Sequence, residues 1–418
     1  MKVKKISGKL LRLAKLFGLM VVLFCLGVGH SYAYKIEIDE NKWVDFKIRG
    51  QLAYHNLDER GGEQDYRQNY FEPTEAEFYA TGQLTPLFQF FTQWEANYQE
   101  LDLSGKEKSE GDVTMKETGV LMPFAPEFKV RFGRIRTPIS RYHQRSDYKK
   151  LIPTDHFYRY DIYGLFKERS GDFKLGFNKT VLNIRQPGVL FFGDTQEGMF
   201  RYYGGIYNQT DNNHKDFRYT ARLVFTPTML GFEPESSLKG TRGDTYLGKK
   251  DILTIGLGYA KGKISSEEFY NLEVGPTLDN EIYALDLTVE KKCGPIVPNF
   301  GAGYIKAEES HLNSRIKPED SEFWYAQGQL LYDAVVGIGK PAIAVRFERM
   351  DADQGYQNEA VKSDRLSVSI NYYIKGFDAM VALCLDNLSY KDGAEDYLKA
   401  ENKEDSVTDG SLFLQFVF

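Results

Sequence analysis

Apolar and polar residues alternate one by one along most of this chain. From Leu366 to Ile374, every second residue is apolar or aromatic, and the residues between them are Ser, Asn or Tyr. A period of two is typical of a β-strand with one apolar and one polar face. Sixteen segments show this pattern, near residues 43–54, 71–84, 87–98, 112–122, 127–135, 186–194, 199–208, 216–227, 250–261, 280–291, 296–307, 322–333, 340–350, 364–375, 378–391 and 411–418. Most approach the about 9–11 residues that a tilted strand needs to cross a bilayer.

The connections between these segments alternate in length. Those at 85–86, 123–126, 195–198 and 375–377 are short, and those at 55–70, 136–184, 263–279, 309–321, 352–363 and 392–410 are long. Short turns at one rim and long loops at the other are typical of an outer-membrane barrel. The pattern predicts an all-β fold, a transmembrane antiparallel β-barrel of 16 strands with both termini at the periplasmic rim. Residues 228–249 are an exception, because they fall on the short-turn side and yet are long.

A soluble β-sandwich also has alternating strands and is the main alternative. Tyr, Phe and Trp gather near the ends of the apolar faces, as they do in the aromatic girdles of membrane barrels. A closed barrel with apolar residues outside and polar residues inside is the form that lipid requires of a β-protein. We therefore expect residues 34–418 to form one membrane barrel domain.

The amino terminus predicts export. Six basic residues precede the apolar run Leu16–Val28, and Ser31-Tyr32-Ala33 fits a small-x-small cleavage site. Residues 1–33 are therefore expected to be a cleaved signal peptide. Export together with the predicted membrane barrel indicates a Gram-negative-type outer membrane as the location. Residues 34–418 then hold 47 basic and 59 acidic residues, a net charge of −12. Only Cys293 and Cys384 remain, so a disulfide-stapled scaffold is excluded.

No catalytic or metal signature stands out. His-Glu-x-x-His and Gly-x-Ser-x-Gly are absent, and the bland interpretation of His143 and His156 as polar loop residues is favoured over metal ligation. Gly243–Lys249 resembles a phosphate-binding loop, but Lys250 replaces Ser or Thr and the residues after it alternate like a strand. Gly256, Gly258, Gly301 and Gly303 are expected to leave room for a neighbouring aromatic ring. We expect no enzymatic activity, no cofactor and no nucleic-acid partner.

The stretch 134–185 differs in charge from the rest of the chain. It holds twelve Lys or Arg and five acids, an excess of +7 in a chain of net charge −6. A solvated charged face is the bland interpretation of such a stretch. A loop folded into a barrel lumen would instead form a constriction at 136–184, and its charges would select anions. The residues expected to form this anion-binding constriction are Lys129, Arg131, Arg136, Arg141, Arg145, Lys149, Lys150, Arg159 and Arg185.

Three motifs carry a resemblance to a known family. Phe132-Gly-Arg-Ile-Arg-Thr-Pro138, then Arg185-x-x-Gly188 with Tyr202–Asn208, is similar to the phosphate-selective porin O and P family. The terminal Phe418 resembles the assembly signal of outer-membrane barrels. This resemblance implies a trimeric channel of sixteen strands with its third extracellular loop folded inward. It implies contact with lipid and with the barrel-assembly machinery through the C-terminal strand.

Three functions remain open from the sequence. The first is a passive diffusion channel for small hydrophilic solutes that prefers anions, phosphate or other oxyanions among them. A non-selective general porin is the second. The third is a barrel enzyme, or a structural barrel with a plugged lumen.

Overall fold

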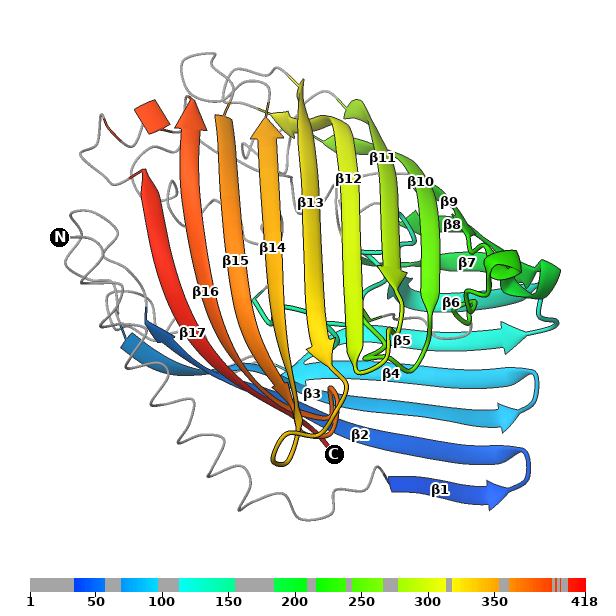
Figure 1. Ribbon diagram of the computed structural model, residues 1–418. Coiled ribbons are helices and arrows are strands. Elements are labelled where there is room, and N and C mark those ends of the chain that lie inside the picture. Colours follow the sequence, from blue (N-terminus) through cyan, green and yellow to red (C-terminus); the bar gives the residue numbers. More distant parts are fainter. Residues whose placement is uncertain are drawn as a thin grey trace.

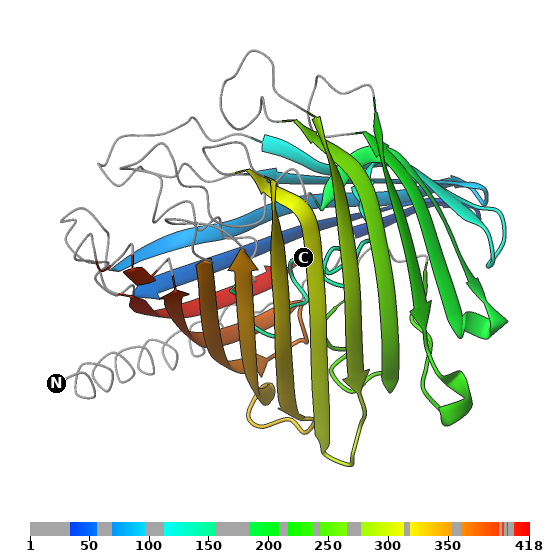
Figure 2. The ribbon, with the colours of Figure 1, turned by 90° about the horizontal axis from the view of Figure 1, so that it is seen from above.

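The computed structural model describes residues 34–56, 69–96, 113–154, 184–208, 216–237, 243–265, 277–312, 318–352, 361–392, 395–396, 399 and 405–418. Within these ranges seventeen strands form one sheet, and sixteen of them close into a barrel (Figures 1 and 2). The barrel strands are β2 (Lys42–Asn56), β3 (Asn69–Thr85), β4 (Phe88–Ala96), β5 (Val113–Pro123), β6 (Lys129–Arg136), β7 (Arg185–Thr195), β8 (Phe200–Asn208), β9 (Phe217–Phe225), β10 (Ile252–Ser265), β11 (Thr277–Glu290), β12 (Ile296–Leu312), β13 (Pro318–Tyr332), β14 (Lys340–Ala352), β15 (Val361–Tyr373), β16 (Ala379–Asp392) and β17 (Ser406–Val417).

Each strand pairs antiparallel with its neighbour in the chain, and β17 closes the ring by pairing with β2. The prediction of an all-β, sixteen-stranded antiparallel barrel is confirmed, and each of the sixteen predicted segments coincides with one of these strands. Among the described residues, no helix is long and apolar enough to cross a membrane.

One strand was not predicted. Tyr34–Asp39 (β1) forms a hairpin with the first residues of β2, and Tyr34 lies opposite Phe46. Phe418 exchanges two backbone hydrogen bonds with Ile48, two residues further along β2. β1 therefore continues the edge of β2 from the point where β17 ends.

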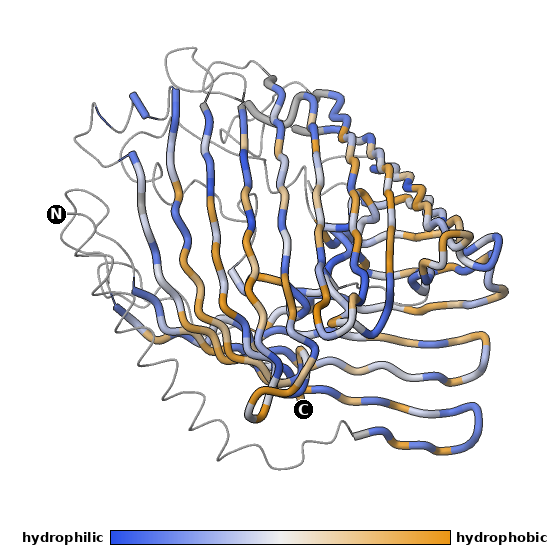
Figure 3. Tube along the Cα trace, viewed as in Figure 1, coloured by the Kyte–Doolittle hydropathy of each residue, from blue (hydrophilic) through white to orange (hydrophobic). Residues whose placement is uncertain are grey.

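The outer surface is apolar and the inner surface is polar. Phe132 is 59% exposed and its neighbour Arg131 is 8% exposed, while Leu223 is 63% exposed and Arg222 is 3% exposed. The alternation is visible along the strands as changes of colour (Figure 3). This arrangement is the reverse of a soluble sandwich, whose apolar faces turn inward, and it fits a barrel surrounded by lipid.

The two ends of the barrel differ in their connections. At one end the strands are joined by the turns 86–87, 124–128, 196–199, 291–295, 333–339 and 374–378. The connection 226–251 lies at this same end and is much longer. The proposed signal peptide, His156, Arg159 and most of the long loops at the other end lie outside the described residues.

The strand glycines make room for different groups. A Cβ at Gly303 would lie 2.5 Å from the ring of Tyr325, which confirms the expectation of a neighbouring aromatic. At Gly258 a Cβ would lie 1.7 Å from the Ile139 carbonyl oxygen, and at Gly256 it would lie 2.3 Å from Arg222 Nη2. For Gly256 and Gly258 the expectation was wrong, because these glycines admit an ion pair and the backbone of a loop.

Candidate functional site

Loop 3, residues 137–184, follows β6, and its described part 137–154 crosses the inside of the barrel (Figure 2). Inward side chains of four distant strands hold its backbone. Asp286 of β11 accepts a hydrogen bond from Arg141 N at 2.9 Å, and Gln415 of β17 donates one to Tyr148 O at 3.0 Å. Further along the loop, Asn371 of β15 donates a hydrogen bond to Leu151 O at 2.6 Å, and Arg346 of β14 donates one to Thr154 O at 3.2 Å. The inward-folded third loop is therefore a feature of the described structure.

Apolar packing fixes the middle of this crossing. Leu151 and Ile152 are fully buried in an apolar cluster with inward residues of β12 to β17, among them Val297, Leu331, Ala344, Met380 and Phe413. Burying one such side chain stabilises a fold by about 1.5–3 kcal/mol. Part of the lumen is thus filled with packed side chains.

Arg136 and Arg185 share two carboxylates where loop 3 leaves and rejoins the wall. Glu117 Oε1 accepts from Arg136 Nε at 2.7 Å and from Arg185 Nε at 2.9 Å. Asp147 of loop 3 accepts from Arg185 Nη2 at 2.8 Å and from Arg136 Nη2 at 3.4 Å. All four side chains are buried, so two positive and two negative charges neutralise one another inside the barrel.

Arg141 and Arg145 bind carboxylates of the connection 226–251, which we call the inner segment. Arg141 makes a bidentate contact of 2.9 Å and 2.9 Å with Glu235, and Arg145 Nη1 lies 3.2 Å from Asp244. Burial lowers the pKa of Arg141, but the Glu235 carboxylate outweighs that effect and raises the pKa above its ordinary value. Each of the two guanidinium groups is therefore paired with a carboxylate of the inner segment.

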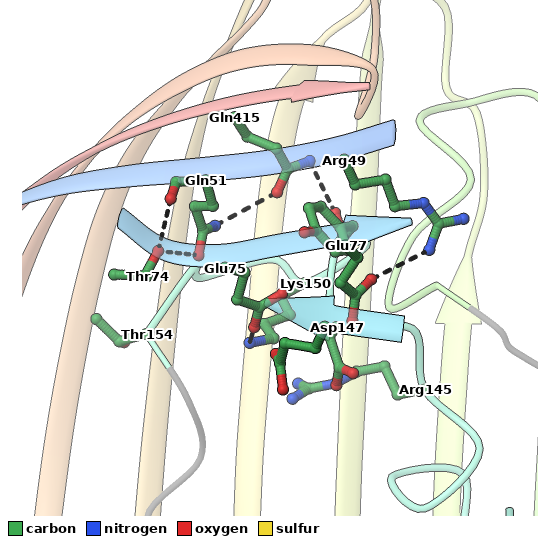
Figure 4. A network of polar contacts seen from close by, with 12 residues as sticks. Arg49, Gln51, Thr74, Glu75, Glu77, Arg145, Asp147, Lys150, Thr154 and Gln415 are labelled. Carbon is green, nitrogen blue, oxygen red and sulfur yellow. Dashed lines mark hydrogen bonds and ion pairs between the residues drawn. The ribbon is translucent and has the colours of Figure 1, made fainter. Parts of the chain in front are cut away.

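A third cluster lies between loop 3 and the wall formed by β2 and β3 (Figure 4). Lys150 Nζ is 3.8 Å from Glu75, and Arg49 Nη1 is 3.8 Å from Glu77. Gln51 links this cluster to the closing strand through a hydrogen bond with Gln415. Loop 3 therefore contacts both sides of the seam where β17 pairs with β2: Tyr148 binds Gln415 of β17, and Lys150 lies close to Glu75 of β3.

The remaining predicted residues have different surroundings. Lys129 Nζ lies 3.2 Å from Asp194, and the guanidinium of Arg131 lies over the rings of Phe91 and Phe192 at 5.2 Å and 5.6 Å. Lys149 is exposed, whereas Arg159 lies outside the described residues. The structure therefore gathers eight of the nine predicted residues inside or beside the lumen, and six of the eight pair with a carboxylate.

The acidic partners were missed from the sequence. They are Glu75, Glu117, Asp147, Asp194, Glu235 and Asp244. Strand parity offered one signal, because Glu117 has the inward parity of β5. The unusual length of residues 228–249 offered another signal. A connection longer than a turn at this end of the barrel can fold into the lumen and bring acidic residues there.

His143 follows the bland interpretation. Its Nδ1 lies 2.7 Å from Ser140 Oγ within the loop, and the side chain is fully buried. Within the described ranges no group of three or more His, Cys, Asp or Glu is placed to hold a metal ion. Cys293 and Cys384 are both free thiols.

Two solved structures align with this barrel over almost their whole length. OmpF of Salmonella typhi, in complex with daunomycin, aligns with a TM-score of 0.56 at 11% identity over 92% of this chain and 100% of its own. The outer-membrane channel DcaP of Acinetobacter baumannii gives a TM-score of 0.52 at 9% identity over 92% and 99% of the two chains. The chain has a porin fold.

Sequence comparison adds little to this result. No family model matches the chain. An uncharacterised protein of Aquifex aeolicus (strain VF5) is 25% identical over 287 residues, which are 65% of this chain and 62% of that protein. The chain thus spans less than two thirds of that relative. The expected kinship with phosphate-selective porins gains no support from these comparisons, whereas the broader porin fold does.

Proposed function

We propose that this protein is an outer-membrane porin, a passive diffusion channel for small hydrophilic solutes. The observation that carries the proposal is a closed sixteen-stranded barrel with a polar interior. A loop crosses this interior, and side chains of the barrel wall hold the loop in place. A loop fixed across a lumen narrows the passage and so limits the size of the solute. We assign the protein no enzymatic activity and no cofactor.

Conductance in a planar bilayer tests this proposal. Purified protein should insert in discrete current steps of uniform size, because each barrel carries one fixed constriction. The control is the same protein denatured by boiling, which should add no steps. Insertion of folded protein without any current would contradict the channel function.

A barrel with a plugged lumen is the second candidate. The apolar cluster of Leu151 and Ile152 with Leu247 favours it, since packed apolar side chains exclude water from that part of the lumen. Charged and amide side chains of β3 and β5, Glu75 and Glu117 among them, face the interior, and a polar lining favours a passage for hydrophilic solutes. The same conductance measurement separates the two candidates.

We further propose that the channel prefers anions, by a smaller margin than the +7 excess of residues 134–185 implies. The inward faces of β6 to β9 carry Lys129, Arg131, Arg136, Arg185, Arg201, Arg218 and Arg222, with Asp194 as the one acid on those faces. Acidic partners compensate many of these charges. Lys149 supports the remaining preference, because its side chain is exposed on the loop.

Replacing Lys149 with Glu should move the reversal potential toward cations. Wild-type channels under a salt gradient should give the sign of anion preference, and K149E should reduce or invert it. The Lys149 backbone oxygen accepts a hydrogen bond from Asp244 N at 2.9 Å, and the substitution keeps this contact between the loop and the inner segment. Lys375→Glu, exposed at the turn 374–378, is the matched control and should change little. A wild-type channel that prefers potassium over chloride at high salt, where outer charges are screened within a few Å, would overturn the anion preference.

The remaining expectations complete the proposal. Residues 1–33 are proposed to direct export and to be cleaved, and the mature barrel is proposed to assemble as a homotrimer through the barrel-assembly machinery. Phosphate and other oxyanions are proposed among the solutes, because the fork of Arg matches their oxygens. Phosphate added to chloride solutions should then reduce the chloride current.

A further inference from the structure

The inner segment, residues 226–251, enters the barrel from the end opposite to loop 3. Its described parts are 226–237 and 243–251. Glu233 N donates to Asp251 O at 2.8 Å and closes a neck where the segment leaves and rejoins the wall. Beyond the neck, Glu235, Asp244 and Thr245 are each at most 6% exposed. The described residues Glu235, Asp244 and Thr245 are therefore packed inside the barrel.

Inward residues of β11 and β12 hold the segment in place. Glu290 accepts hydrogen bonds from Tyr246 N at 3.0 Å and from Gly248 N at 2.8 Å. Asn299 Nδ2 donates to the backbone oxygen of Asp244 at 3.0 Å. Buried polar groups satisfied in this way define one backbone position.

Two carboxylates of the inner segment bind loop 3. The Glu235 carboxylate accepts a hydrogen bond from each terminal nitrogen of Arg141. The Gly243 backbone oxygen accepts a further hydrogen bond from Arg141 Nη2 at 2.8 Å. Asp244 pairs with Arg145 and accepts from Leu151 N at 3.1 Å. Loop 3 is thus bound on one side by the wall and on the other by the inner segment.

Glu235 is the central residue of this contact. Besides Arg141 it accepts from Arg201 Nη2 of β8 at 3.1 Å and from the hydroxyl of Tyr246 at 2.6 Å. It therefore joins the wall, the inner segment and loop 3 through one side chain that is 2% exposed. Removing its charge would leave two buried guanidinium groups without this carboxylate, and buried charges that lose a partner are strongly destabilised.

We propose that the inner segment is a latch that holds loop 3 across the lumen, and that Glu235 is its central positioning residue. This proposal rests on the proposed channel function. The inner segment enters from the short-turn end of the barrel, and by fixing the position of loop 3 it sets the width of the passage. Glu235 itself need not touch a solute. Its effect on transport passes through the position of Arg141 and of the loop that carries it.

A labelling experiment on the full-length protein in membranes tests the latch independently of transport. Ser146, in loop 3 and 2% exposed, is replaced by Cys in a Cys293→Ser, Cys384→Ser background. With Glu235→Gln added, the rate of reaction with a maleimide should rise about tenfold, because a local opening that exposes the loop becomes more populated. Glu233→Gln is the matched control, since Glu233 lies at the exposed neck of the same segment.

Single-channel conductance supplies the second measurement. Glu235→Gln should give larger and less uniform current steps than wild type, while Glu233→Gln should match wild type. Asp244→Asn, which weakens the other contact, should raise labelling by a smaller factor and serves if Glu235→Gln fails to assemble. Equal labelling in wild type, Glu235→Gln and Asp244→Asn would overturn the latch. Faster labelling in a protein that never conducts would uphold the latch and refute the channel.

Discussion

Replacing Glu117 with Ala should destabilise the barrel more than any other single change considered for its interior. Arg136 and Arg185 both bind Glu117 Oε1, at 2.7 Å and 2.9 Å, and both are buried. Breaking a buried ion pair by removing one partner costs about 3–5 kcal/mol. Here one carboxylate serves two guanidinium groups, and both would lose it while keeping their contacts with Asp147.

The measurement is the urea midpoint of unfolding in detergent, read from heat-dependent mobility on gels. Glu117→Ala should lower the midpoint clearly, and Glu117→Gln should lower it less because the amide oxygen still accepts hydrogen bonds. Glu127→Ala is the matched control, an exposed glutamate in the turn 124–128. Adding Arg185→Leu to Glu117→Ala should restore part of the loss, because one uncompensated charge is then gone. A wild-type midpoint for Glu117→Ala would mean that the interior is hydrated well enough to solvate both arginines.

The strands were predictable from sequence because their physical cause is local. A membrane strand must present apolar residues outward and tolerates polar residues inward, so the period of two runs through most of the wall. β1 escaped prediction because it has only six residues, fewer than the about 9–11 that a membrane-crossing strand needs, although Tyr34, Ile36 and Ile38 alternate with charged residues.

The compensation inside the lumen was not predictable, because its causes are distant in sequence. Arg141 is 94 residues from Glu235, and Arg185 is 68 residues from Glu117. Counting charges within residues 134–185 finds the basic excess but cannot find the carboxylates that strands and the inner segment bring to it. The net charge at a loop inside a closed barrel therefore depends on the charged residues of the wall around it.

The inner segment illustrates the same limit. Its length marked residues 228–249 as exceptional, but the direction in which it folds depends on Glu290 and Asn299, which belong to strands that follow it. Gly258 is similar, since its lack of a side chain is explained by the Ile139 carbonyl of loop 3. In each case the conformation or the residue type is explained by a spatial neighbour that is distant in the sequence.

Deleting Phe418, or replacing it with Asp, should leave the protein unfolded in the periplasm. Phe418 ends the strand that closes the barrel, and its backbone exchanges hydrogen bonds of 2.8 Å and 2.9 Å with Ile48 of β2. Its ring lies 5.3 Å from that of Phe416 and is 50% exposed, at the barrel rim. The side chain therefore fills no buried space in the closed barrel, and the proposed role of Phe418 is recognition by an assembly factor.

The size of the effect separates recognition from stability. A charged residue at the rim of a membrane barrel costs only about 0–1 kcal/mol, which is too little to unfold a closed barrel. Phe124→Asp is the matched control, because Phe124 is 53% exposed in a turn at the same end. If the role of Phe418 is recognition, Phe418→Asp should remove nearly all heat-modifiable protein from outer-membrane fractions, while Phe124→Asp should leave it at wild-type amounts. Equal amounts of folded barrel in the two variants would show that the terminal residue contributes nothing beyond its share of the rim.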